Sequence, residues 1–277
     1  MKECYKISTV CRIYDISRQA YYKYLNRSIG EGISEAVVIE KVLSIRHMLP
    51  MVGGKKLYYM LRGELEQIGK GIGRDKLFDI LRRNNLLVRR RKRYVKTTDS
   101  THRFRVYKNL IKELEINRRN QVFVGDITYI PLMDGFCYLS LLTDVYSRKI
   151  VGYCVSDNLT IEGSLRALRM ALKGVTEPDG MIHHTDRGFQ YCSNVYTKLL
   201  NCRKIQISMA EKGNCYENAL AERVNGILKT EFMLDVKFKD IKQAKRAVDE
   251  AIRNYNRIRP HMSIEMKTPD QKYVEAA

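Results

Sequence analysis

Three strand-like runs in the middle of the chain constrain its fold more than any other feature of the sequence. They are rich in Val, Ile, Tyr and Phe, and their apolar positions alternate or run continuously. The runs cover residues 122–130, 136–142 and 149–155. Asp134-Gly135 between the first two runs is typical of a tight hairpin turn. We therefore expect three antiparallel strands in this part of the chain.

Helices and strands are predicted to alternate after these three strands. A helix at 161–172 ends before Gly174 and Pro178. The segments that follow are a strand at 181–185, a helix at 194–200, a strand at 205–208 and a helix at 216–232. This order is that of a ribonuclease-H-like α/β core, in which a mixed five-stranded sheet has helices on both faces.

The N-terminal part of the chain is predicted to be helical and to bind DNA. Residues 8–26 have the outline of a helix-turn-helix, with the turn at 14–16 and Ser17 as the cap of the second helix. Arg18 and Gln19 on the outer face of that helix are then candidate DNA contacts. An ordinary helical hairpin has the same outline, so the pattern leaves both interpretations open.

Further helices are expected downstream. The stretch 28–32, which contains two glycines, predicts a break before a helix at 34–48. Helices at 55–65 and 74–84 form a pair that resembles a second helix-turn-helix. We interpret the Gly-x-Gly-x-Gly pattern at 69–73 as a turn, because no strand precedes it and no Gly-Lys-Ser/Thr follows, as a phosphate-binding loop requires.

The distribution of charge points to a polyanionic partner. The chain has a net charge of +19, and residues 1–117 carry 26 Lys and Arg against 12 Asp and Glu, while residues 118–235 carry 14 against 13. Cations that displace counterions from phosphates supply most of the non-specific affinity for nucleic acid. A ribosomal-type or generally basic soluble protein has a similar composition. The densest run, interpreted as an arm that follows the DNA backbone rather than as a solvated linker, is Arg89, Arg90, Arg91, Lys92 and Arg93.

Neither a membrane segment nor a disulfide framework is expected. No run of about 18 apolar residues exists, and the first residues lack the apolar stretch of a signal peptide. The seven cysteines are odd in number and irregular in spacing, and they include no Cys-x-x-Cys pair. They are typical of reduced thiols, so we expect a cytoplasmic protein.

These patterns divide the chain into four parts. They are an all-α DNA-binding region with two helix-turn-helix-like units and the basic arm at 1–95, a linker with one helix near 107–114 at 96–119, the ribonuclease-H-like core at 120–235, and a small helical tail at 236–277. In the tail, apolar residues four positions apart predict a helix that ends before Pro260.

Three carboxylates are the candidate catalytic residues. Asp126 lies in an apolar strand, where a lone carboxylate is costly to bury unless something such as a metal pairs with it. Asp186 lies at the end of a predicted strand and Glu222 on the long helix, with 35 residues between them. Phosphodiester chemistry uses two divalent cations, Mg²⁺ or Mn²⁺, which prefer oxygen ligands. Although a single acid is more often a surface charge, the agreement of placement and spacing favours a two-metal site.

Glu222 is expected to share one face of its helix with three other polar residues. Asn218, Asn225 and Lys229 stand at positions that repeat every three or four residues around Glu222. The two asparagines are therefore candidate DNA contacts, and Lys229, two turns further on, is expected to meet the DNA end. A lysine of this kind, taken alone, is more often solvated.

Other acids compete with these three for the site. Asp144 is interpreted as a turn-forming partner of Ser147 or Arg148, and a catalytic role is the alternative. Glu217 and Glu231 do not have the spacing expected of the third acid.

Three histidines have open or structural interpretations. His183 and His184 either position metal or water, or form structural hydrogen bonds at the end of their strand. His261, which follows Pro260, is interpreted as structural.

Five motifs resemble those of the DDE transposases and retroviral integrases. The resemblance is closest to the transposase encoded by the second reading frame of bacterial insertion sequences of the third family, and it covers nearly the whole chain. The motifs lie at 124–130, 144–152, 183–191, 213–222 and 255–261. The family places its catalytic acids where Asp126, Asp186 and Glu222 stand, and its downstream basic residue where Lys229 stands.

The resemblance implies partners and also shows one departure. The family often has tryptophan near the first acid, whereas this chain has no tryptophan and offers Phe123 there, which we expect to be a change of packing only. Family members often act as a fusion with the product of a short upstream reading frame, so that product is an expected partner. Two DNA ends must be held together, which implies a dimer or a higher oligomer.

The leading hypothesis is a transposase that binds the terminal inverted repeats of its element, nicks them at their 3′ ends and transfers the strands to target DNA. A ribonuclease-H-like nuclease without joining activity is the second hypothesis, and a pre-cut end with a 3′-hydroxyl distinguishes the two because a plain nuclease will not join it. The third hypothesis is a non-catalytic DNA-binding regulator, against which the intact acids argue.

Overall fold

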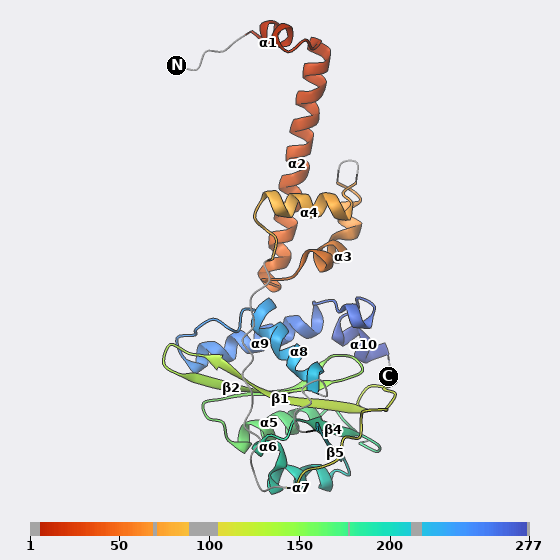
Figure 1. Cartoon of the computed structure of the whole chain (residues 1–277), viewed down its shortest axis with the longest axis vertical. Coiled ribbons are helices and arrows are strands. Elements are labelled where there is room, and N and C mark those ends of the chain that lie inside the picture. The colour runs from red at the N-terminus through yellow and green to blue at the C-terminus, as the bar shows by residue number, and fades with distance from the viewer. Residues whose placement is uncertain (1–5, 69–70, 89–104, 177, 212–217, 276–277) are drawn as a thin grey trace. The chain divides into compact units, whose positions relative to one another are not determined.

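A computed structural model describes residues 6–68, 71–88, 105–176, 178–211 and 218–275 (Figure 1). The chain divides into two compact units. The helical unit contains residues 1–48 and 52–89, and the catalytic unit contains residues 49–51 and 90–277. In the part of the chain that the structure describes, no helix is both long and apolar enough to cross a membrane.

In its described residues, the helical unit contains α1 (Ile7–Ile13), α2 (Arg18–Met48), α3 (Gly54–Leu65) and α4 (Arg74–Arg83). Their buried side chains recur every three or four residues, as an amphipathic helix requires. Those with the least exposure are Val38, Val42, Leu57, Leu65 and Leu77. As predicted, the Ser17 hydroxyl caps α2 by accepting a hydrogen bond from the backbone N–H of Ala20 at 3.0 Å.

The predicted break at 28–32 is wrong, because α2 runs without interruption through Gly30 and Gly32. Both glycines face open space, so each weakens the helix without forcing the chain to turn. The helix is supported at this point by the Arg27–Glu31 ion pair, one turn apart at 3.1 Å. No proline is present to remove a helical hydrogen bond, and α2 therefore continues to Met48.

The catalytic unit is built on a mixed five-stranded sheet, as predicted. Its strands are β1 (Val122–Pro131), β2 (Phe136–Asp144), β3 (Ile150–Ser156), β4 (Ile182–Thr185) and β5 (Gln206–Met209). They are arranged in the order β3-β2-β1-β4-β5. The pairs β1–β2 and β2–β3 are antiparallel, whereas β1–β4 and β4–β5 are parallel. β1, which carries Asp126, is therefore the central strand.

Helices cover both faces of this sheet (Figure 1). One face carries α5 (Ile161–Leu172), α6 (Phe189–Cys192) and α7 (Asn194–Cys202), which enclose the larger core. The other face carries α8 (Ala219–Glu231), α9 (Ile241–Arg257), the 3₁₀ turn η2 (Met262–Ile264) and α10 (Pro269–Glu275). Phe123, which stands where the family often has tryptophan, is fully buried in the larger core.

The helix predicted near 107–114 is not formed. The chain is irregular here because its backbone bonds to the neighbouring sheet edge. The N–H of Leu110 donates to the hydroxyl of Ser208 at 2.9 Å, and the N–H of Met209 donates to the carbonyl of Lys108 at 3.4 Å. Ile111 then packs on the smaller core under α8. Contacts with β5 have replaced the local helical preference.

The cysteines are free thiols wherever the structure describes them. The five described residues are Cys11, Cys137, Cys154, Cys192 and Cys202, whereas Cys4 and Cys215 lie outside the described residues. The expectation of reduced cysteines is therefore met by the five that can be placed.

Candidate active site

Asp126 stands on the central strand with both carboxylate oxygens engaged. One oxygen accepts the N–H of Ile127 at 2.9 Å, and the other accepts the side-chain amide of Asn225 at 2.7 Å. Burial raises the pKa of Asp126 to about 7, and the charge of Asp186 is the second cause. The amide of Asn225 and the N–H of Ile127 oppose this rise without cancelling it. Asp126 therefore lies where negative charge is poorly compensated by the protein.

Asp186 reaches the same place from the neighbouring strand. Thr185, the last residue of β4, pairs with Gly125 of β1, so the next residue on each strand is one of the two aspartates. The N–H of Gly188 donates to the Asp186 carboxylate at 2.9 Å. A Cβ at Gly188 would lie 2.9 Å from that same oxygen, so a side chain there would disturb the carboxylate. This glycine allows the chain to turn closely around Asp186.

Glu222 lies on the first turn of α8, the helix whose Asn225 bonds to Asp126. Its side chain is exposed, and its charge adds to the rise in the pKa of Asp126. Among the described residues, no three His, Cys, Asp or Glu side chains are grouped closely enough to hold a metal ion. The three acids are thus electrostatically coupled around Asp126 without forming a closed ligand cluster.

Two asparagines connect α8 to β1. The amide of Asn225 donates to Asp126, and the amide of Asn218 lies 3.5 Å from the carbonyl of Gly125. Their side chains are only 6% and 5% exposed. The DNA contacts predicted for both residues stay predictions, but their observed contacts are with the strand. Asn225 is the residue that positions the Asp126 carboxylate.

Lys229 lies on the same helix within electrostatic range of Asp126. Its side chain is half-buried, and burial lowers the pKa of its ammonium group. The charges of Asp126 and Asp235 act in the opposite direction. Lys229 is therefore a half-buried cation within electrostatic range of Asp126, and the contact with the DNA end predicted for it stays a prediction.

His183 and His184 make structural contacts. His183 is 2% exposed, and its Nε2 lies 2.9 Å from the hydroxyl of Tyr196. Burial lowers the pKa of His183 to about 3, and the adjacent His184 adds to this effect, so the ring is neutral near pH 7. Nδ1 of His184 lies 2.8 Å from the hydroxyl of Ser208 on β5. Of the two interpretations left open by the sequence, these contacts favour structural hydrogen bonding.

Asp144 has the turn-forming role that we predicted for it. The carboxylate is fully buried and accepts hydrogen bonds from the N–H and hydroxyl of Ser147 at 2.8 and 2.5 Å. It also accepts the N–H of Asn120 at 2.9 Å. Burial raises its pKa despite these donors. Asp144 therefore stabilises the turn between β2 and β3.

A buried ion pair holds the far end of α8, and sequence reasoning missed its cation. Arg259 binds the Glu231 carboxylate with two hydrogen bonds of 2.7 and 2.8 Å, and it donates a third, of 2.7 Å, to His261. Arg259 is 4% exposed and lies over the ring of Tyr255 at 5.7 Å. The motif at 255–261, which contains Arg259, was the sequence feature that could have pointed to this residue. Glu231, unsuited by spacing to catalysis, is instead the anchor of the helix that carries Glu222.

The predicted DNA contacts in the helical part of the chain are only partly described. Arg18 and Gln19 are exposed on the first turn of α2. Arg89, Arg90, Arg91, Lys92 and Arg93 lie outside the described residues.

Comparison with known proteins gives two family matches and several relatives. An integrase core domain family matches residues 116–215, and a second integrase core domain family matches residues 203–269. The 31 kDa protein of insertion element IS600 from Shigella sonnei is 32% identical over 256 residues, which are 91% of this chain and 93% of that protein. Transposase InsF of insertion sequence IS3A from Escherichia coli is 29% identical over 271 residues, which are 96% of this chain and 93% of InsF.

A solved structure also resembles the catalytic unit. It is the catalytic core domain of HTLV-2 integrase in complex with magnesium, with 20% identity and a TM-score of 0.44. The match covers 56% of this chain and 96% of that domain.

Proposed function

This chain belongs to the family of insertion-element transposases with an integrase core, and from that premise we propose that Asp126, Asp186 and Glu222 carry metal-dependent nicking and strand transfer at the ends of its own element. A DDE-type transposase is a polynucleotidyl transferase that acts in DNA transposition. The observation that carries the proposal is the electrostatic coupling of Asp126 to both other acids, which come from a neighbouring strand end and from α8.

The chemistry of the donor set, rather than its present spacing, suits two Mg²⁺ or Mn²⁺ ions. All three candidate ligands are carboxylates, the oxygen donors that these hard cations prefer. The raised pKa of Asp126 reflects burial and negative charge that a divalent cation would offset. When bound, the ions would activate the attacking oxygen and stabilise the leaving oxygen of a phosphodiester.

The reaction consists of two displacements at phosphorus. In the first, the oxygen of a water molecule bonds to the phosphorus at the element end, and the bond from phosphorus to the 3′ oxygen breaks, which leaves a 3′-hydroxyl. In the second, that hydroxyl bonds to the phosphorus of another phosphodiester and displaces its 3′ oxygen. The two steps are chemically alike, so one set of carboxylates serves both.

Other side chains support these carboxylates. Asn225 holds one oxygen of Asp126, which leaves less freedom for the carboxylate to rotate away from the reacting phosphate. Lys229 is a half-buried cation near Asp126, in a position to contact phosphate close to the cut. Arg259 acts at a distance through Glu231 by fixing the end of α8.

DNA is the proposed partner of both units. The helical unit, with Arg18 and Gln19, and the basic run 89–93 bind the terminal inverted repeats, and the catalytic unit receives the target duplex. Two element ends are held by a dimer or a higher oligomer. The product of the upstream reading frame acts as a fusion or as a separate partner.

The test is strand transfer by acid-to-amide variants. Asp186→Asn and Glu222→Gln are expected to abolish Mg²⁺-dependent nicking and joining while end binding persists. Glu250→Gln on the exposed face of α9 is the matched control and should retain activity. Normal strand transfer by either active-site variant would refute the assignment. A pre-cut 3′-hydroxyl end distinguishes the alternative of a plain nuclease, which would not join it.

A further inference from the structure

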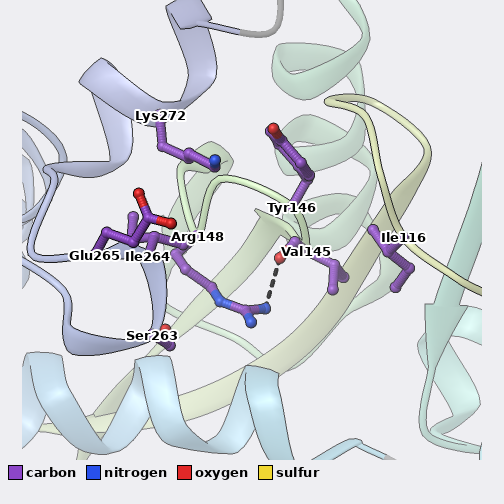
Figure 2. Close-up of a pocket in the computed structure, with 8 residues that line it drawn as sticks. All are labelled: Ile116, Val145, Tyr146, Arg148, Ser263, Ile264, Glu265 and Lys272. Carbon is purple, nitrogen blue, oxygen red and sulfur yellow. Dashed lines mark hydrogen bonds between the residues drawn. The ribbon is translucent and has the colours of Figure 1, made fainter.

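A pocket opens in the catalytic unit beside the turn between β2 and β3 (Figure 2). One wall is formed by residues 145–148 and the other by residues 263–272. Its volume is about 300 Å³, which is at the lower end of the range for small-ligand sites. The polar groups that line it include Arg148, Lys272, Tyr146 and Ser263.

Arg148 supplies a cation on which the buried Asp144 acts electrostatically from beyond ion-pair distance. Its side chain is half-buried, and one NH group donates to the carbonyl of Val145 at 2.5 Å. No carboxylate lies within ion-pair distance of it among the described residues. The nearby Asp144 is occupied by Ser147 and Asn120. A half-buried guanidinium of this kind is stabilised by an incoming anion.

Lys272 adds a second cation, on α10. Its ammonium group lies 4.9 Å from the ring centroid of Tyr146, and the nearest carboxylate oxygen, on Glu275, is 4.0 Å away. Figure 2 shows Lys272 and Tyr146 facing each other across the pocket. The one acid in the lining, Glu265, is 78% exposed and lies 3.6 Å from Lys267. The interior of the pocket is therefore cationic, with an aromatic ring on one side.

The backbone of both walls is held in conformations that side chains rarely adopt. Arg148 has a φ of 66°, and Glu265 and Met266 have φ values of 58° and 61°. Hydrogen bonds fix these turns: the hydroxyl of Tyr255 donates to the carbonyl of Arg148 at 3.1 Å, and the N–H of Met266 donates to the carbonyl of His261 at 2.8 Å. Strain of this kind gathers at functional sites, where the surrounding structure maintains it.

The pocket lies next to the helix that carries Glu222. Ile116 and Val145 from its lining pack on the same small core as Leu220 and Ala221 of α8. The charge of Arg223, the residue after Glu222, acts on Arg148. Arg223 is exposed. One cation near the start of α8 thus lies within electrostatic range of the pocket.

We propose that this pocket binds one phosphodiester of a DNA strand, with Arg148 and Lys272 on the phosphate and Tyr146 against the attached sugar or base. The inference rests on the proposed function, because that function supplies DNA as the polyanion near Glu222. The occupant comes from either the element end or the target duplex, and the chemistry recognised is the same for both. The pocket is an accessory site that fixes the path of the strand as it leaves the catalytic acids.

The experiment measures the salt dependence of DNA binding. The probes are a duplex with the terminal repeat of the element and a duplex of unrelated sequence, each titrated against the full chain by fluorescence anisotropy. Lys272→Gln and Arg148→Gln are the pocket variants, and Lys242→Gln, an exposed lysine of α9, removes the same charge outside the pocket. Each pocket variant should reduce the slope of log K against log salt by about 1 for the duplex that occupies the pocket.

Each outcome bears on the inference. A slope change confined to one duplex identifies the occupant, and a change for both duplexes supports a shared phosphate site. The inference is overturned if Lys272→Gln keeps the wild-type slope, or if Lys242→Gln changes the slope equally. If Arg148→Gln does not fold, the slope of Lys272→Gln alone is the test. If the wild-type chain does no DNA chemistry while the slopes still change, the proposed function fails and the pocket stands.

Discussion

The helical unit and the catalytic unit each contain an arginine–glutamate ion pair, and the two pairs differ in burial. In the helical unit, the Arg62–Glu66 pair lies in solvent at 3.2 Å, with side chains 68% and 65% exposed. In the catalytic unit, the Arg259–Glu231 pair has a similar distance, 2.7 Å, but its side chains are 4% and 22% exposed. Exposed pairs contribute about 0–1 kcal/mol because water screens them, whereas breaking a buried pair leaves an uncompensated charge. The distance between the charged atoms therefore does not by itself indicate how much an ion pair contributes to stability.

The largest expected effect comes from removing the buried cation. Arg259→Gln should lower the free energy of unfolding of the catalytic unit by about 3–5 kcal/mol, because Glu231 loses the two charge-assisted hydrogen bonds of its buried ion pair. Arg62→Gln is the matched change in the helical unit and should cost less than about 1 kcal/mol. Urea unfolding measures both. Equal losses of stability in the two variants would contradict the expected dependence on burial.

The second effect is a pH dependence of stability that Asp126 creates. Its folded-state pKa of about 7 lies above the unfolded value near 4, so the folded state binds the proton more tightly. In metal-free protein, stability from this group is present below about pH 4 and is lost as the pH rises to about 7. The loss amounts to roughly 4 kcal/mol at most.

Unfolding midpoints of wild type and Asp126→Asn between these two pH values test this expectation. In Asp126→Asn, stability should no longer decline over this pH range. In Asp79→Asn, which changes an exposed acid of α4, the decline should remain. If Asp126→Asn shows the same decline as wild type, the carboxylate is not the source.

A third contrast concerns two glycines. A Cβ at Gly152 of β3 would lie 2.2 Å from the carbonyl oxygen of Ala167, so α5 must move to accommodate it. Gly152→Ala should therefore destabilise the catalytic unit by about 1–3 kcal/mol. Gly63 lies in α3 of the helical unit with nothing within 4 Å of such a Cβ, and Gly63→Ala should stabilise by up to about 1 kcal/mol. Thermal unfolding should give opposite signs for the two variants.

The smallest effect separates the two asparagines of α8. The amide of Asn225 lowers the pKa of Asp126, so Asn225→Ala should raise that pKa. In metal-free protein, the midpoint of the decline in stability with pH should then move toward higher pH. Asn218 is the control, because its amide faces the carbonyl of Gly125 and not a carboxylate. Asn218→Ala is expected to leave the midpoint in place, and a similar shift in both variants would contradict a specific role for Asn225.

Much of the catalytic unit could be predicted from sequence because its signals are local. The apolar alternation of β1 to β3 and the periodicity of α5, Ile161–Leu172, each lie within a dozen residues, and the five-stranded sheet follows from their order. The family itself was recognisable from five short motifs. The placement of Asp186 directly after a strand came from the same kind of pattern.

The errors arose where a local signal competed with the surrounding structure. Gly30 and Gly32 suggested a break, but the side chains around them support one continuous α2. Residues 107–114 suggested a helix, but hydrogen bonds to β5 hold them in an irregular path. Asn225 was predicted to contact DNA, which stays a prediction, but its bond to Asp126 on a distant strand could not be read from its helix face.

Most of the elements, the family and the three candidate acids could be inferred from the sequence, because periodicity and motif spacing are properties of short segments. Which residues hold those acids in place depends on the tertiary structure. Asn225 and Asp126 are 99 residues apart in the chain, and Arg259 and Glu231 are 28 apart. No local pattern encodes such a pairing. It arises when tertiary packing buries two polar groups together, where each stabilises the other through a hydrogen bond that water no longer supplies.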